Sequence, residues 1–114
     1  MEVPIVKVKY FRNLRNLLNV GEEEYNVEDG TTIINLLFNH VPKRHWNTSS
    51  MWREKLFETE DGEVKRDREG IPILRDFYII LVNEKHLELI SKDGGKYRLK
   101  NGDAISIFPS AGGG

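Results

Sequence analysis

Apolar and lysine side chains alternate over residues 6–10. A period of two is typical of a strand with one buried face. Over residues 11–18 the apolar positions instead recur every three or four residues, which predicts a short amphipathic helix that Gly21 ends. A second, weaker strand is expected over residues 23–27, with Tyr25 facing inward.

The longest helical pattern follows a turn at residues 28–30. Thr31 or Thr32 can cap a helix, and the apolar positions of residues 33–41 form one stripe along it. We expect this main helix to end at Pro42, because the residue before a proline avoids helical geometry.

The segment from about Pro42 to Leu74 has a different composition. It holds seven Lys or Arg and seven Asp or Glu residues, so it is neutral. A short helix after residues 48–50, with Trp52 and Leu56 one turn apart, is expected to pack over one end of the sheet. Residues 58–70 carry a single large apolar side chain and predict an exposed loop or hairpin. Mixed charge of this kind favours a solvated surface over a recognition surface.

The last third of the chain predicts further strands. A continuous apolar run at residues 77–82 is typical of a central strand buried on both faces. We expect a short edge segment at residues 87–90, a turn at residues 93–95, and a tight turn at residues 100–103 before the final strand. Together these elements predict an α+β domain, a mixed sheet of four to five strands around one main helix.

Size and composition narrow the classes of function. The 114 residues fit a single domain spanning 1–114. Net charge is −1, and no apolar run reaches about 18 residues, so we expect no nucleic-acid partner, no membrane segment and a cytoplasmic location. There is no cysteine, which excludes disulfides and thiolate ligands. A metal site is not expected either, because His40 and His45 straddle Pro42 and His86 is isolated.

Residues 109–114 form a tail that ends in Gly112, Gly113 and Gly114. Glycine has no side chain to pack and loses more backbone entropy on ordering than other residues, so stability gives no reason for this ending. Such a tail offers reach, on the order of 20 Å, and it is slim enough to enter a narrow channel. The alternative is a frayed terminus or a linker.

The residues before the tail favour a tail that enters a narrow channel over a frayed terminus or a linker. Gly102-Asp103 is followed by the apolar run 104–108, by Pro109, by three more residues and by the terminal diglycine. This arrangement resembles the closing segment of the MoaD/ThiS family of ubiquitin-like sulfur carriers. In the molybdopterin branch of that family, the corresponding segment reads Gly-Asp, a hydrophobic strand, Phe-Pro-Pro, two residues and Gly-Gly.

Two other stretches are similar to the family. They are the first strand with the following helical turn at residues 14–18, and the strand that runs into Val82-Asn83. The resemblance covers both ends of the chain and leaves the segment from about residue 42 to residue 74 as an insertion. Ser110 stands where the family motif has its second proline, and we expect it to loosen the exit of the tail. Gly112 adds one more flexible residue.

The resemblance implies a β-grasp (ubiquitin-like) fold and a role as a sulfur carrier. It implies that an ATP-dependent adenylating enzyme of the ubiquitin-activating type acts on Gly114, and that a sulfur donor then converts this residue to a thiocarboxylate. The tail of a MoaD-like protein next enters the large subunit of molybdopterin synthase. Gly114 would carry the transferred atom, with Gly113 and Gly112 as the slim neck, and Phe108 and Pro109 would bind the partner. Alternatively, Phe108 closes the core and Pro109 ends the strand.

No cofactor is expected on this chain, because it has neither a phosphate-binding loop nor a dinucleotide fingerprint. Two other functions stay open: a ubiquitin-like modifier joined through Gly114 to lysines of target proteins, and a non-catalytic β-grasp interaction module with an inert tail. The pathway that would use the sulfur stays open too, since transfer-RNA thiolation and thiamine synthesis use similar carriers.

The remaining polar residues that could act in catalysis or partner binding have simpler explanations. Glu60, Asp61 and Glu63 lie in the most solvated stretch, and residues 22–24 are expected to form a solvated strand edge. Arg98 and Lys100 could guide the tail toward an acidic partner, or they are plain exposed charges.

Overall fold

The computed structural model describes residues 3–90 and 94–110. Within these ranges the main sheet has five strands in the order β2-β1-β7-β5-β6. The central β7 runs parallel to β1 and antiparallel to β5, and both outer pairs are antiparallel. This is the mixed sheet that the sequence predicts. The strands are β1 (Ile5–Tyr10), β2 (Glu22–Asn26), β5 (Tyr78–Val82), β6 (Lys85–His86) and β7 (Ala104–Pro109).

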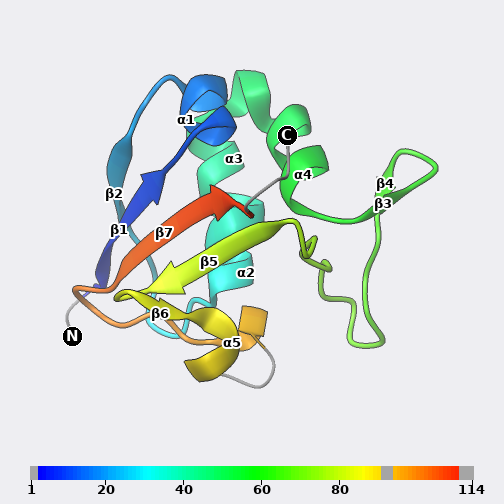
Figure 1. Ribbon diagram of the computed structural model, residues 1–114. Coiled ribbons are helices and arrows are strands. Elements are labelled where there is room, and N and C mark those ends of the chain that lie inside the picture. Colours follow the sequence, from blue (N-terminus) through cyan, green and yellow to red (C-terminus); the bar gives the residue numbers. More distant parts are fainter. Residues whose placement is uncertain (1–2, 91–93, 111–114) are drawn as a thin grey trace.

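One face of the sheet is covered by a continuous helical segment, which lies behind the strands in Figure 1. It consists of α2 (Ile33–Asn35), a π-helical turn η1 (Leu36–His40) and α3 (Val41–Arg44). The Thr32 side chain caps its start by accepting a hydrogen bond from the Asn35 N–H at 3.2 Å. None of the helices in the described ranges is long and apolar enough to cross a membrane.

The core lies between this helical segment and the sheet. Alternate residues of β1 and β7 point into it, as the period of two predicts, and the apolar stripe of the main helix meets them. Burying each of these side chains fully contributes on the order of 1.5–3 kcal/mol. The core side chains of these three elements that are at most 1% exposed are Val6, Val8, Tyr10, Ile33, Leu36, Leu37, Val41, Ile105 and Ile107.

The first helix, α1 (Asn13–Leu18), ends earlier than expected. Asn19 adopts the left-handed conformation (φ 58°, ψ 37°), and its backbone N–H donates to the Arg15 carbonyl at 2.8 Å. Asparagine tolerates this conformation because its short polar side chain bonds locally. The prediction that Gly21 ends the helix is therefore wrong, since Asn19 already does so.

The prediction that Pro42 ends the main helix is also wrong. Val41 keeps helical backbone angles (φ −65°, ψ −50°) directly before Pro42, and the helix continues to Arg44. Proline has no N–H, so it leaves carbonyls of the preceding turn without their helical donor. Two side chains from the next helix supply the missing donors. Trp52 Nε1 donates to the Leu37 carbonyl at 2.7 Å, and the Arg53 guanidinium donates to the Phe38 carbonyl at 3.1 and 3.0 Å.

The segment after Pro42 contains the expected short helix, α4 (Ser49–Leu56), preceded by a 3₁₀ turn η2 (Trp46–Thr48). Trp52 and Leu56 are fully buried, and Trp52 packs edge-to-face on Tyr10 with 5.6 Å between the ring centroids. The contact with Tyr10 places α4 at the end of β1, as predicted.

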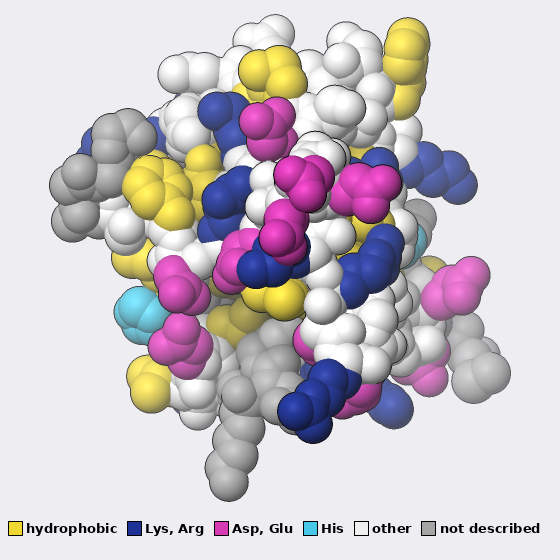
Figure 2. All heavy atoms as spheres, turned by 90° about the vertical axis from the view of Figure 1, so that its right-hand side faces the viewer, with side chains coloured by type: hydrophobic (Ala, Val, Ile, Leu, Met, Phe, Trp, Pro, Cys, Tyr) yellow, Lys and Arg dark blue, Asp and Glu magenta, His cyan; other side chains and the backbone are white. Residues whose placement is uncertain are grey.

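Residues 58–70 form the expected hairpin, with β3 (Thr59–Glu60) and β4 (Glu63–Val64). Asp61 and Gly62 both have positive φ (53° and 83°), as a tight two-residue hairpin turn requires. On the face that carries this hairpin, Lys and Arg side chains lie among Asp and Glu side chains, and neither sign gathers alone (Figure 2).

Two expectations for the last third need correction. The strand β5, expected at the centre and buried on both faces, lies next to the central β7. Only its alternate residues Ile80 and Val82 are buried, because no described helix covers the other face of the sheet. Residues 87–90 form a helical turn, α5 (Leu87–Ile90), in place of an edge strand, and the edge is the two-residue β6. Of the turn expected at residues 93–95, Asp93 lies outside the described residues, and Gly94–Lys96 form a 3₁₀ turn, η3.

Candidate functional site

The strand that leads to the glycines, β7, is the central strand of the sheet. β7 is bonded to β1 on one side and to β5 on the other, and Pro109 is the last residue of its register, opposite Tyr78. The described chain ends one residue later, at Ser110. Of the predicted site residues, Phe108 and Pro109 therefore lie in β7. Gly112, Gly113 and Gly114 lie outside the described residues, so their predicted roles stay predictions.

Ser110 holds the exit of the strand more firmly than its sequence suggests. Its backbone N–H donates to the Phe77 carbonyl at 2.9 Å and so adds one further bond between the β7 and β5 sides. A proline at this position has no N–H and cannot make that bond. The expectation that Ser110 loosens the exit is therefore wrong as far as the described chain reaches.

Phe108 does not close the core. It lies on the sheet face opposite the helical segment, where it is half-buried. Its ring packs edge-to-face on Phe11, with 5.8 Å between the centroids, and its register partner on β5 is the half-buried Ile79. Ser106 and Leu81 are the next pair on the same face. Of the two predicted roles for Phe108, this position fits partner binding better than core packing.

The Gly-Asp pair before β7 has a structural role in the described fold. Asp103 is only 5% exposed, and its carboxylate accepts hydrogen bonds from Asn83 Nδ2 at 2.9 Å, from the Tyr97 hydroxyl at 3.0 Å and from the Lys100 N–H at 2.8 Å. Burial, and then the hydrogen bond to Asp103, raise the pKa of Tyr97. The aspartate therefore fixes the start of β7, which sets the register of the strand up to Pro109.

A side-chain pair that sequence reasoning missed lies at the other end of β7. Asn13 Nδ2, at the start of α1, donates to the Tyr78 hydroxyl at 2.8 Å. Asn13 Oδ1 is buried and accepts no hydrogen bond from the residues that the structure describes. No sequence signal marks this pair, because the two residues are 65 positions apart.

A second missed feature is a buried polar cluster under the β2 edge. The Tyr25 and Tyr10 hydroxyls donate to Glu23 Oε2 at 2.6 and 2.9 Å, and His45 Nε2 lies 2.8 Å from Glu23 Oε1. The Arg44 guanidinium stacks over the Tyr25 ring at 3.9 Å. The expectation of a solvated strand edge at residues 22–24 is therefore wrong for Glu23, whose side chain is 12% exposed.

The electrostatics of this cluster favour an ionised Glu23 between neutral tyrosines. Burial alone raises the pKa of Glu23, but hydrogen bonds from Tyr25, His45 and Tyr10 outweigh it and hold the pKa below its usual range. Burial is also the main reason that the pKa of Tyr10 and that of Tyr25 lie far above their usual value. The cluster joins β2 to the end of the main helix, and its role in the described fold is structural.

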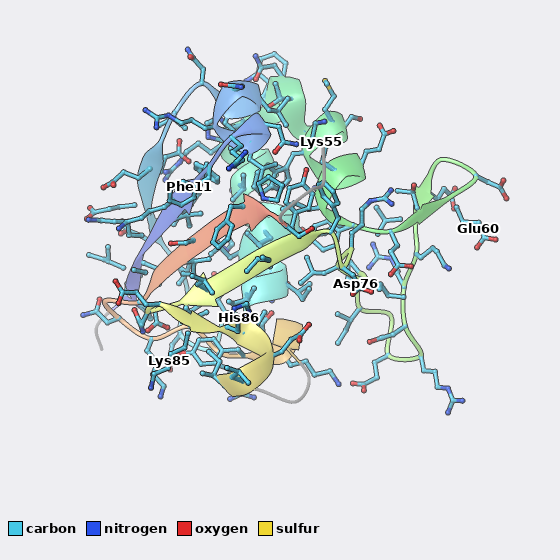
Figure 3. All side chains as sticks on the ribbon, in the orientation of Figure 1. Phe11, Lys55, Glu60, Asp76, Lys85 and His86 are labelled. Carbon is cyan, nitrogen blue, oxygen red and sulfur yellow. The ribbon has the colours of Figure 1, made fainter. Side chains whose placement is uncertain are left out.

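The other histidines and acids do not gather into one site. Burial, and then the nearby Lys43, lower the pKa of His40. His86 lies on β6, whereas Glu60 projects from the β3–β4 hairpin away from the sheet (Figure 3). Across residues 3–90 and 94–110 there is no group of three or more metal-ligating side chains. Arg98 and Lys100 precede β7, at the end opposite Pro109, so their position does not fit guidance of the tail.

A hollow of about 770 Å³ lies alongside β5. Its walls come from residues 67–76, from β5 and β6, and from α5 and η3, and they mix apolar side chains with charges of both signs. Two of the wall residues, Lys96 and Glu69, form an ion pair at 2.7 Å. Such a mixture indicates no single class of ligand.

The chain has clear relatives among known proteins. The profile of the ThiS family matches residues 8–114, whereas no curated protein sequence matches the chain. The solution structure of the small archaeal modifier protein 1 from Methanosarcina acetivorans is 25% identical, with a TM-score of 0.70 and 100% of each chain covered. A Pyrococcus furiosus protein assigned as molybdopterin converting factor, subunit 1, is 28% identical, with a TM-score of 0.61 over 95% of this chain and 99% of its own.

More distant structures share the fold. The solution structure of Urm1 from Trypanosoma brucei has a TM-score of 0.56 at 18% identity, with 100% of this chain and 99% of its own covered. The five-stranded mixed sheet and these similarities confirm the α+β, ubiquitin-like β-grasp fold that the resemblance predicts.

Proposed function

The chain belongs to the ThiS family, and from this premise we propose that it is a sulfur carrier loaded at Gly114. A separate adenylating enzyme uses ATP to convert the Gly114 carboxylate to an acyl-adenylate, with release of pyrophosphate. A donor of sulfide-level sulfur then attacks the activated carbonyl carbon, so that a carbon–sulfur bond forms as the carbon–oxygen bond to AMP breaks. AMP leaves, and a thiocarboxylate remains. Activation is needed because the negative charge of a free carboxylate opposes nucleophilic attack.

The observation that carries this proposal is the continuity of β7 with the glycines. The strand is paired with β1 as far as Ile107 and with β5 as far as Pro109, and the Ser110 N–H extends the pairing toward β5 by one more residue. This pairing holds the chain in place up to Ser110, the last described residue before the glycines. The family match reaches Gly114, so the proposal covers the whole segment.

The open sheet face supports the assignment of Phe108 and Pro109 as partner-binding residues. Phe11 is 40% exposed beside Phe108, and Ile79 and Leu81 extend the apolar surface along β5. Aromatic side chains on such a surface are typical of the energetic centre of an interface. The proposed occupants are the adenylating enzyme and, after it, the large subunit of molybdopterin synthase.

Molybdopterin synthesis is the pathway that we propose for the sulfur. The assignment of the similar Pyrococcus furiosus protein as molybdopterin converting factor, subunit 1, supports it, and so does Phe108-Pro109 ahead of the tail. The similarity to a small archaeal modifier protein favours one alternative, conjugation of Gly114 to lysines of other proteins. Both routes share the adenylation step and differ in the nucleophile that follows it.

ATP–pyrophosphate exchange tests the shared step. The full chain is incubated with the ubiquitin-activating-type enzyme of its own source, and we expect exchange that depends on the carrier concentration. A variant that lacks Gly114 serves as the control and should give no exchange. Exchange that persists without Gly114, or that never depends on the carrier, would contradict the proposal.

A further inference from the structure

The outer edge of β5 is open at the start of the strand. On its inner edge the Phe77 carbonyl accepts from the Ser110 N–H, so the odd-numbered residues of β5 direct their main-chain groups toward β7. The even-numbered residues then direct theirs toward the outer edge, because the sides alternate along an antiparallel ladder. β6 pairs with β5 only at Leu81 and Val82, and after these two pairs the chain turns into α5.

Two main-chain groups on this outer edge lack a hydrogen-bond partner among the described residues. They are the Tyr78 carbonyl and the Ile80 N–H, and no residue of the ranges 3–90 and 94–110 bonds to either. Ile80 is only 7% exposed. Main-chain groups at such positions are normally bonded, because burial removes their hydration without compensation. The edge therefore offers one acceptor and one donor to an incoming chain.

The opposite edge of the sheet is protected. On β2 the outward-facing Glu24 carbonyl accepts from the Arg44 guanidinium at 2.8 Å, and the strand begins with three consecutive glutamates. Covering groups and charged side chains are the usual means by which a sheet edge avoids an added strand. Residues 77–80 carry no charge. The contrast identifies β5, not β2, as the edge that can accept a strand.

The open edge forms part of the wall of the hollow alongside β5. Tyr78 and Ile80 line it, and so do Pro72 and Leu74 from the loop that follows β4. In that loop Ile73 bonds to the hairpin through both its N–H and its carbonyl, so its even-numbered neighbours direct their main-chain groups away from the hairpin. Figure 1 shows α5 below β5 and this loop to its right. The volume of about 770 Å³ lies within the range of about 300–1,000 Å³ that is typical of binding sites.

Unpaired acidic side chains flank the open edge. The wall holds four acidic and three basic side chains. Asp76, just before β5, and Glu88, on α5, are both exposed, and neither forms an ion pair with a described residue. The other two acids are engaged, since Asp67 accepts N–H groups of its own turn and Glu69 pairs with Lys96. A complementary occupant carries Lys or Arg at its ends.

We propose that the outer edge of β5 is a docking site for an extended segment of a partner protein, which adds to the sheet as a further strand. The segment donates an N–H to the Tyr78 carbonyl and accepts a bond from the Ile80 N–H, as in other cases of strand addition. Its alternate apolar side chains enter the hollow, and basic residues at its ends face Asp76 and Glu88. Main-chain bonds carry the recognition, so the mixed charge of the wall does not oppose it. The site does not depend on the loading of Gly114.

Titration of the full chain with short peptides, followed by amide exchange at single residues, tests the proposal. The probe is acetyl-Lys-Val-Thr-Ile-Thr-Val-Lys-amide, the lysine peptide. A glutamate peptide has glutamate in place of both lysines, and a proline peptide has proline at the three central positions and so has no N–H there. The double variant Asp76→Lys, Glu88→Lys reverses the flanking charge. Glu60→Lys, Glu63→Lys is the matched control, because these exposed residues do not line the hollow.

In the free chain we expect the Ile80 amide to exchange faster than the amides of Ile79 and Leu81, which face β7. The lysine peptide, at about ten times its Kd, should slow exchange at Ile80 about tenfold and leave the Glu24 amide on β2 unchanged. The proline peptide should not bind.

Reversal of the flanking charge should weaken the lysine peptide by about threefold to tenfold, the effect of two exposed charge pairs. The same double variant should bind the glutamate peptide more tightly than the natural chain does. The matched control should bind all three peptides as the natural chain does.

Equal exchange at Ile80 with and without the lysine peptide would overturn the inference. Equal binding of the proline peptide would overturn it too, because main-chain bonds would then carry no recognition. Slower exchange at Glu24 in place of Ile80 would put the added strand on β2. Slow exchange at Ile80 that depends on the concentration of the chain alone would show that a second copy occupies the edge. No activating enzyme takes part in these measurements, so their result is independent of the proposed function.

Discussion

Replacing Glu23 by alanine should destabilise the fold far more than replacing either neighbouring glutamate. Glu23 is the shared acceptor of Tyr10, Tyr25 and His45, whereas Glu22 forms only a solvent-exposed pair with Lys7 at 3.5 Å. Glu22→Ala is therefore a matched control on the same strand, since an exposed pair contributes about 0–1 kcal/mol.

The expected loss of stability follows from the hydroxyl protons that lose their acceptor when Glu23 is removed. Two tyrosine hydroxyls lie 2.9 Å apart, and both reach Glu23 Oε2. Without Glu23 one hydroxyl can donate to the other, and the second proton is left buried with no acceptor, at a cost of about 1–3 kcal/mol. The lost partner of His45 adds about 1 kcal/mol. We expect a total of about 2–4 kcal/mol, which lowers the thermal midpoint by roughly 8–16 °C for a domain of this size.

Urea unfolding at neutral pH and thermal unfolding measure this difference directly. The depressed pKa of Glu23 also sets a pH dependence. A group whose pKa is lower in the folded state stabilises the fold above its unfolded pKa, about 4.3 for glutamate, and that contribution disappears as the pH falls through the folded pKa. The gap between the natural chain and Glu23→Ala should therefore narrow below about pH 4.3. Equal midpoints for Glu23→Ala and Glu22→Ala would refute this account of the cluster.

Three further predictions concern the exit of the tail. Deleting Gly114 should abolish adenylation and leave the thermal midpoint unchanged, because a terminal glycine has no side chain to bury. A lower thermal midpoint than that of the natural chain, measured by calorimetry, would show that the tail has a structural role. Ser110→Pro should lose the bond to Phe77 and lower the unfolding free energy by about 0.5–1.5 kcal/mol, and an unchanged urea midpoint would count against that bond. Phe108→Ala should weaken binding of the adenylating enzyme in titration calorimetry at a small cost in stability, whereas Ile107→Ala should cost about 2–5 kcal/mol; the reverse order would place Phe108 in the core.

Patterns carried by neighbouring residues predicted the fold well. The alternation at Val6, Val8 and Tyr10 gave a strand with these residues buried, and the stripe of residues 33–41 gave the helix over the sheet. Both patterns report which side of an element is buried, and burial dominates the energetics of these elements. The same reasoning predicted α4, where Trp52 and Leu56 are fully buried.

The errors came from contacts between distant parts of the chain. Pro42 failed to end its helix because Trp52 and Arg53 bind the carbonyls that it leaves without donors. Glu23 was expected in solvent, yet Tyr10 and His45 reach it from other elements. No local pattern contains these partners, so sequence reasoning could not find them.

The same distinction between local patterns and distant contacts applies to the candidate site. The positions of Phe108 and Pro109 at the end of the last strand followed from the apolar run before them and are confirmed. The bond between Asn13 and Tyr78 depends on the order β1-β7-β5, which the chain order of the strands does not reveal. The roles of Gly112, Gly113 and Gly114 rest on the family and stay predictions.

Intact-mass spectrometry of the chain, isolated with its natural partners, tests the central claim most directly. Our account predicts a fraction whose mass is higher by the exchange of one oxygen for one sulfur, with the change located at Gly114. A Gly-Gly remnant on lysines of other proteins, without that fraction, would favour the modifier instead. A tail that carries neither mark while its activating enzyme is present and active would contradict the proposal.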